Sequence, residues 1–123
     1  MITEFGDMKY SIGWRTNRSI RLFDKEYDII VRLLAYREDQ ELTEKQLEAC
    51  KVYATNEADM LADMEKLIMD YASDYKERFM PKMLLVHRNG SVALTCDDAQ
   101  EPDEGIAVCV YPEKVVLSLD EYL

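Results

Sequence analysis

The chain has 123 residues, of which 48% are hydrophobic and 33% are charged, and its 25 acidic side chains outnumber the 15 basic ones to give a net charge of -10. This length and hydrophobic content predict one folded domain over residues 1–123, and they exclude a disordered chain. The negative charge argues against binding to nucleic acid or to anionic membrane surfaces, because both repel an acidic protein.

The sequence predicts neither a membrane span nor a secretion signal. The longest apolar runs, such as 83–86, are much shorter than a helix that crosses a bilayer. Glu4 and Asp7 lie where a signal peptide would carry basic residues. The three cysteines are odd in number and form no Cys-x-x-Cys pair, which is typical of buried, reduced thiols. We therefore expect a cytoplasmic protein.

Three strands are predicted at the start of the chain. Apolar side chains alternate with polar ones over residues 8–14, which is the period of a half-buried strand. A turn at 16–17 is expected to lead into a short second strand at 19–22, and a turn at 24–25 into a third at 27–36. The third strand is apolar on one face and partly apolar on the other, which predicts a central position in the sheet.

The hydrophobic period becomes helical over residues 43–79. Thr43 is a good N-cap, and Gln46 three residues later completes a capping box. Asn56 and the residue before it interrupt the apolar stripe, so either two helices or one kinked helix is expected. Pro81 is predicted to end the helical region.

Two hairpins are predicted in the last third of the chain. The Asn-Gly pair at 89–90 indicates a two-residue turn, and pairing around it places His87 opposite Val92. A second hairpin is expected to turn at 112–113, with Val110 opposite Val115. Both registers match apolar partners.

The elements together predict an α+β domain. Its expected order is β-β-β-α-α-β-β-β-β, with a mainly antiparallel sheet and one or two helices at 43–79 packed on one face. The predicted registers point Cys96 and Cys109 to different sides of the sheet, which argues against a disulfide between them.

Three groups of residues are candidates for a functional site. His87 is the one histidine and the obvious candidate for acid–base chemistry, but the predicted register places it among aliphatic side chains, where a histidine is usually structural. The loop 97–104 holds five acids without the spacing of a calcium loop, so it is either solvated or a contact surface for a basic partner. Trp14 is a candidate core residue or binding anchor.

No catalytic, phosphate-binding or metal-binding motif is recognisable, so we expect no catalytic residue, cofactor or metal. The expected function is that of a non-enzymatic acidic domain that binds a protein, with these candidate contact residues: Asp97, Asp98, Glu101, Asp103, Glu104 and Trp14. Two alternatives stay open. One is a small-molecule or metal-dependent enzyme that uses His87 and the acids of 97–104. The other is a self-associating structural domain.

Several motifs follow one another in an order that points to a family: Trp14, the segment 19–23, Leu42-Thr43-Glu44-Lys45-Gln46, Cys50-Lys51-Val52-Tyr53, Asn89-Gly90 and the segment 103–108. This order resembles a group of small bacterial domains of unknown function. In such domains an acidic Glu-Gly or Glu-His-Gly segment starts a late strand, and here Glu104 and Gly105 are adjacent with no histidine between them. The resemblance implies an immunity or accessory protein of bacterial toxin loci. Together with the acidic composition, this role predicts binding to a basic protein such as a nuclease toxin.

Overall fold

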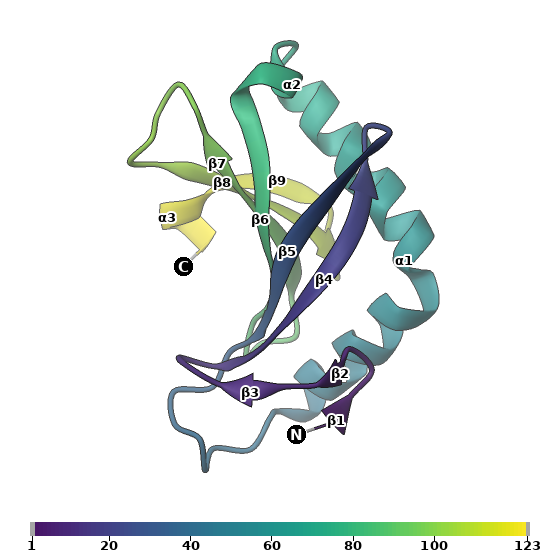
Figure 1. Ribbon diagram of the computed structural model, residues 1–123, viewed down its shortest axis with the longest axis vertical. Coiled ribbons are helices and arrows are strands. Elements are labelled where there is room, and N and C mark those ends of the chain that lie inside the picture. The colour runs from purple at the N-terminus through teal and green to yellow at the C-terminus, as the bar shows by residue number, and fades with distance from the viewer. Residues whose placement is uncertain (1, 123) are drawn as a thin grey trace.

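A computed structural model describes residues 2–122 and shows a twisted seven-stranded sheet with a long helix across one face (Figure 1). The strands lie in chain order: β3 (Lys9–Tyr10), β4 (Trp14–Leu22), β5 (Lys25–Leu33), β6 (Phe79–Val86), β7 (Val92–Asp98), β8 (Gly105–Tyr111) and β9 (Val115–Ser118). Neighbouring strands are antiparallel except β5 and β6, which are parallel because helices α1 (Glu44–Tyr71) and α2 (Tyr75–Arg78) connect them. The predicted α+β class and mainly antiparallel sheet are confirmed.

Three short elements were not expected. Strands β1 (Ile2–Thr3) and β2 (Gly6–Asp7) form a separate ribbon, and helix α3 (Leu119–Tyr122) follows β9 directly. The ring of Phe5, in the turn of the ribbon, lies 5.8 Å from the ring of Tyr53 in α1. Elements of two to four residues are too short to show a hydrophobic period, so the sequence did not reveal them.

The first turn lies earlier than predicted. The chain turns at 11–13, and β4 runs without a break through 16–17, where a turn was expected. Ile12 and Gly13 both have positive φ angles, 53° and 100°. A Cβ atom on Gly13 would lie 2.9 Å from the carbonyl oxygen of Leu33, so glycine is required there. Ile12, expected inside a strand, is 78% exposed.

Helix α1 is a single kinked helix. The Thr43 hydroxyl accepts a hydrogen bond from the Gln46 backbone N–H, and the Gln46 side-chain oxygen accepts one from the Thr43 N–H, each at 3.0 Å. The predicted capping box is therefore confirmed. The kink lies at Asn56, whose φ of -120° and ψ of 23° are not helical. Its side-chain amide donates to the Val52 carbonyl oxygen at 2.8 Å, which satisfies a group near the break.

Pro81 does not end the helical region. Helix α2 already ends at Arg78, and Pro81 lies in β6, where a bulge between Pro81 and Met83 shifts the pairing with β7. Pairing of β6 with β5 starts only at Met83. The missing N–H of the proline therefore falls beyond the parallel ladder, which is why a central strand tolerates it.

Both C-terminal hairpins pair one residue away from the predicted register. Val86, and not His87, lies opposite Val92. The reason is a three-residue loop at 88–90, closed by a 2.9 Å hydrogen bond from the His87 N–H to the Ser91 carbonyl oxygen. Its last residue is a glycine with φ of 88°, the usual end of such a loop. A shift of one residue reverses the faces, so His87 lies on the face away from the helix.

The second hairpin shows the same shift. Cys109, and not Val110, lies opposite Val115. The turn between β4 and β5 is also one residue early, at Phe23 and Asp24, which both have positive φ. The β8–β9 loop is longer than the predicted two-residue turn, whereas the β4–β5 turn keeps its predicted length and is only displaced by one position.

The main core lies between α1 and one face of the sheet. The helix contributes Cys50, Tyr53, Met64 and Ile68, each at most 1% exposed. A smaller cluster on the other face is formed by Ala93, Ala107 and Cys109, with Leu117, Leu119 and Tyr122 packed against it. Cys96 belongs to the first cluster and Cys109 to the second, so the two cysteines point to different sides as predicted, and all three thiols are unpaired. Within residues 2–122, no helix is long and apolar enough to cross a membrane.

Candidate functional site

The structure places the predicted site residues at two opposite ends of the sheet. Strand β7 lies between the hairpin of His87 and the acidic loop, and its seven residues span roughly 23 Å. Trp14 pairs with Leu33, and Leu33 pairs with Val86, the residue before His87. Trp14 therefore lies at the same end of the sheet as His87. The pocket that His87 lines includes none of the acids of 97–104. His87 and the acids of 97–104, which the enzyme alternative would combine in one site, therefore do not lie together.

Trp14 lies at the border of the core. Its ring meets the ring of Tyr10 edge to face with the centroids 5.6 Å apart, and it packs against the main core. Its Nε1 atom is buried and has no hydrogen-bond partner within residues 2–122. This placement favours the core role of Trp14 over that of an exposed binding anchor.

Helix α2 and the loop between β7 and β8 form one end of the molecule (Figure 1). The Ala99 N–H donates to the Arg78 carbonyl oxygen at 2.8 Å, and the Gln100 side-chain amide donates to the Asp74 carboxylate. These bonds hold the loop against the helix. We call this region, with the last turn of α1, the acidic end, and its carboxylates are Asp70, Asp74, Glu77, Glu101, Asp103 and Glu104.

Two of the predicted contact acids already have partners. Asp98 is 4% exposed and accepts two 2.9 Å hydrogen bonds from the Arg78 guanidinium group. This charged pair lowers the pKa of Asp98. A carboxylate oxygen of Asp97 lies 3.6 Å from the Lys82 ammonium group. Asp98 therefore acts in the fold and is not available to a partner.

The other three predicted acids are exposed: Glu101, Asp103 and Glu104. None of them forms an ion pair with a basic side chain within residues 2–122. Glu101 raises the pKa of Glu104 through a shared hydrogen bond and through its charge. Each of two neighbouring carboxylates disfavours the charged form of the other.

Exposed apolar side chains border the acidic end. Met69, Tyr71 and Met80 are 48%, 49% and 52% exposed. The ring of Tyr71 lies 5.8 Å from that of Phe79, next to Met80. The last turn of α1 carries no basic residue, so the negative end of the helix dipole adds to the acids. This end of the molecule thus carries both exposed apolar side chains and negative charge.

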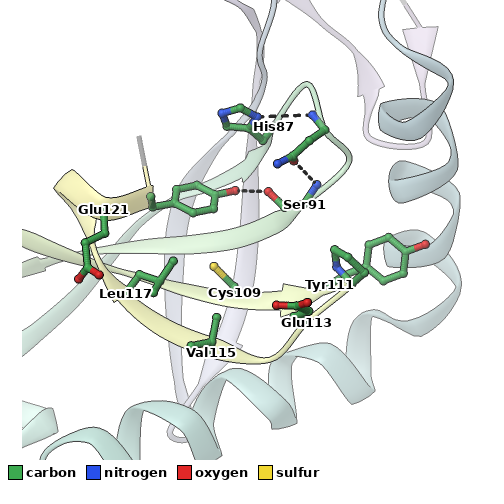
Figure 2. A pocket seen from close by; sticks show the side chains of 11 residues that line it. His87, Ser91, Cys109, Tyr111, Glu113, Val115, Leu117 and Glu121 are labelled. Carbon is green, nitrogen blue, oxygen red and sulfur yellow. Dashed lines mark hydrogen bonds between the residues drawn. The ribbon is translucent and has the colours of Figure 1, made fainter.

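A pocket of about 410 Å³ lies beside His87 (Figure 2). Its walls come from the β6–β7 hairpin, the β8–β9 hairpin and α3. The His87 ring meets the ring of Tyr122 edge to face at 6.0 Å, and the Tyr122 hydroxyl shares a 2.8 Å hydrogen bond with the Ser91 hydroxyl. Below them, Cys109, Val115 and Leu117 give the pocket an apolar floor.

The chemistry of this pocket favours binding over nucleophilic catalysis. Burial, and then the charge of Glu113, raise the pKa of the Cys109 thiol. Burial also raises the pKa of the Tyr122 hydroxyl. A thiol attacks as the thiolate, so a raised pKa makes Cys109 a poor nucleophile at neutral pH. Within residues 2–122, no three side chains of His, Cys, Asp or Glu are grouped to hold a metal ion.

Sequence reasoning identified His87 but missed the rest of the pocket. Ser91, Cys109, Glu113 and Tyr122 meet only through the loop lengths and the short helix α3. One signal was available, because the predicted register already turned Cys109 away from the main core.

Comparison with known proteins gives a family and no function. No curated protein and no solved structure matches the chain. A family model described as "Domain of unknown function (DUF6985)" matches residues 4–89, which is more than half of the chain. The matched segment contains α1 and the strands from β2 to β6, and it ends in the hairpin of His87. The likeness to uncharacterised domains is thus confirmed, and the chain belongs to the DUF6985 family.

Proposed function

We propose that this domain is a non-enzymatic binding module that docks on a basic protein through its acidic end. The observation that carries the proposal is the unpaired, exposed group of Glu101, Asp103 and Glu104, in which like charges are neighbours. Repulsion between these charges does not stabilise the fold, whereas Lys or Arg side chains of a partner would relieve it on binding.

The apolar side chains beside these acids supply the other half of a contact. Met69, Tyr71 and Met80 are exposed beside the acidic end. Protein interfaces commonly place apolar, Tyr and Met side chains at their centre with a polar rim around them. The acids would speed association and select a basic partner, while the apolar groups would hold it.

This chemistry fits the immunity or accessory role that the resemblance implies. In that role the partner is a basic bacterial protein such as a nuclease toxin, and the complex forms in the cytoplasm. A net charge of -10 would steer such a partner toward the domain over a range set by the ionic strength.

The test is capture of the partner from a lysate of the native host at low and at high salt, with identification by mass spectrometry. The variant Glu101→Gln, Asp103→Asn, Glu104→Gln removes three charges from the acidic end. The matched control, Glu38→Gln, Glu41→Gln, Glu48→Gln, removes three exposed charges near the start of α1, at the other end of the molecule. We expect a specific basic protein that the first variant loses and the control retains. A partner that both variants retain equally, at any salt concentration, would refute the proposal.

A further inference from the structure

We propose that the pocket beside His87 binds a small molecule that carries an ammonium group on a short apolar body. The pocket lies at the opposite end of β7 from the acidic end, so this site is separate from the proposed docking surface. Its volume of about 410 Å³ falls within the range of roughly 300–1,000 Å³ that is usual for small-molecule sites.

The floor of the pocket suits an apolar group. Cys109 is buried in the second core cluster, and Leu117 packs against that cluster. Val115 is 38% exposed although it is a large aliphatic residue in a strand. A ligand that covered Val115 would remove apolar surface from water without any change in the fold.

The charge of the pocket suits a cation. The lining contains the carboxylates of Glu113 and Glu121 and no Lys or Arg. The neighbouring Lys114 does not neutralise Glu113, because its ammonium group lies 3.2 Å from the Asp63 carboxylate. One oxygen of Glu121 accepts the Ser118 N–H at 3.2 Å, which leaves Glu113 as the lining carboxylate with no hydrogen bond or ion pair within residues 2–122.

The position of the Glu113 carboxylate also suits an ammonium group. Figure 2 shows this carboxylate on the same side of the β8–β9 hairpin as the Cys109 sulfur. Glu113 lines the same pocket as Cys109, Val115 and Leu117, so the carboxylate lies beside the apolar floor. A carboxylate at the edge of an apolar surface attracts an ammonium group more strongly than one in open water.

The hydrogen bond between the hydroxyl groups of Ser91 and Tyr122 holds two walls of the pocket together. It joins α3, at the end of the described chain, to the β6–β7 hairpin. The matched family segment ends at residue 89, so Ser91, Cys109, Glu113 and Tyr122 all lie beyond it. The ligand preference of the pocket is therefore set by the C-terminal strands and α3 of this chain.

The experiment is a titration of the ¹⁵N-labelled protein with 2-phenylethylamine, followed by amide NMR, with 2-phenylethanol as the uncharged analogue. We expect saturable shifts at the amides of Ser91, Cys109, Glu113 and Tyr122. We expect the amine to bind at least fivefold more tightly than the alcohol, because only the amine reaches Glu113 as a cation.

Two variants separate the contributions. Glu113→Gln should weaken the amine at least fivefold and leave the alcohol unchanged, whereas Glu26→Gln, with the same charge change at the far end of β5, should leave both unchanged. Val115→Phe, at a partly exposed position, should fill the pocket and weaken both probes, and the NMR spectrum itself reports whether it folds. The proposal is overturned by the absence of saturable shifts with the amine. It is overturned equally by amine and alcohol affinities that are equal, or by equal effects of Glu113→Gln and Glu26→Gln.

Discussion

The side-chain amide of Gln46 donates a 2.8 Å hydrogen bond to the carbonyl oxygen of Leu34, directly after strand β5. The same amide donates to the carbonyl oxygen of Val86, the last residue of β6, at 3.2 Å, and its oxygen accepts from the Arg88 guanidinium group at 3.1 Å. Gln46 is fully buried. One side chain thus joins the first turn of α1 to the ends of both parallel strands.

Replacement of Gln46 by Glu should destabilise the protein by about 2–4 kcal/mol, because a carboxylate of the same size cannot donate to the two carbonyl oxygens and would bury a charge. Urea unfolding at pH 7 measures this change. Gln40→Glu is the matched control, since the Gln40 oxygen only accepts a hydrogen bond from the Tyr36 N–H and a carboxylate can replace it. Equal unfolding midpoints for the two variants would contradict the role of Gln46.

The pair of Arg78 and Asp98 predicts a specific acid sensitivity. The pKa of Asp98 is lower in the folded protein than in the unfolded chain, where it is about 4. Its contribution to stability is therefore complete above that unfolded value and is lost as the pH falls through the lower folded pKa. We expect Asp98→Asn to be less stable than the unchanged protein at pH 7, and the two stabilities to converge as the pH falls below 4.

Asp103→Asn is the control for this series, because Asp103 is an exposed carboxylate without an ion-pair partner within residues 2–122. Its unfolding midpoint should follow that of the unchanged protein from pH 7 to pH 3. If Asp98→Asn followed the same curve, the paired hydrogen bonds to Arg78 would not contribute to stability.

What the sequence predicted well is local. The capping box of Thr43 and Gln46 lies within four residues, so its chemistry can be read without a partner element. The kink at Asn56 was equally visible, because an asparagine in mid-helix competes for backbone hydrogen bonds. The placement of Gln46 between two strands was not visible, since it depends on strands 12 and 40 residues away.

The sequence predicted hairpin registers and turn positions poorly, because these depend mainly on loop length. The Asn-Gly pair at 89–90 fits both a two-residue and a three-residue turn, and only the second leaves His87 out of the main core. The turn at 11–13 was hidden because Ile12 extended the apolar alternation although it lies outside the strand. The pocket beside His87 follows from these loop lengths, and for that reason it appears only in the structure.

The cysteines should differ in their rates of alkylation. Burial, with minor contributions from nearby acids, raises the pKa values of Cys50 and Cys96 to about 12, which leaves about one thiol in ten thousand ionised at pH 8. Cys109 also has a raised pKa, but its sulfur faces the pocket. We expect iodoacetamide to modify Cys109 first in the native protein and all three cysteines at similar rates in urea. Peptide mass spectrometry over time measures the order, and prior modification of Cys50 or Cys96 would contradict it.

Three basic residues form a row across the first three strands of the sheet. Lys9 lies opposite Arg15, and Arg15 lies opposite Arg32. Neither arginine forms an ion pair with a carboxylate within residues 2–122. Burial, and then the charge of Arg15, lower the pKa of Arg32. Like charges directly opposite each other destabilise a sheet, so this row is a weak point of the fold.

The change Arg15→Glu should therefore stabilise the protein by about 0.5–1 kcal/mol, because it replaces two repulsive cross-strand pairs with two attractive ones. The matched control is Arg21→Glu, which changes the same charge in the same strand. Arg21 lies opposite Glu26, so there the substitution creates a repulsive pair and should destabilise. Urea unfolding at low salt measures both changes, and salt should reduce both because it screens exposed charges. Equal signs for the two variants would show that net charge, and not the cross-strand pairing, decides the stability of this face.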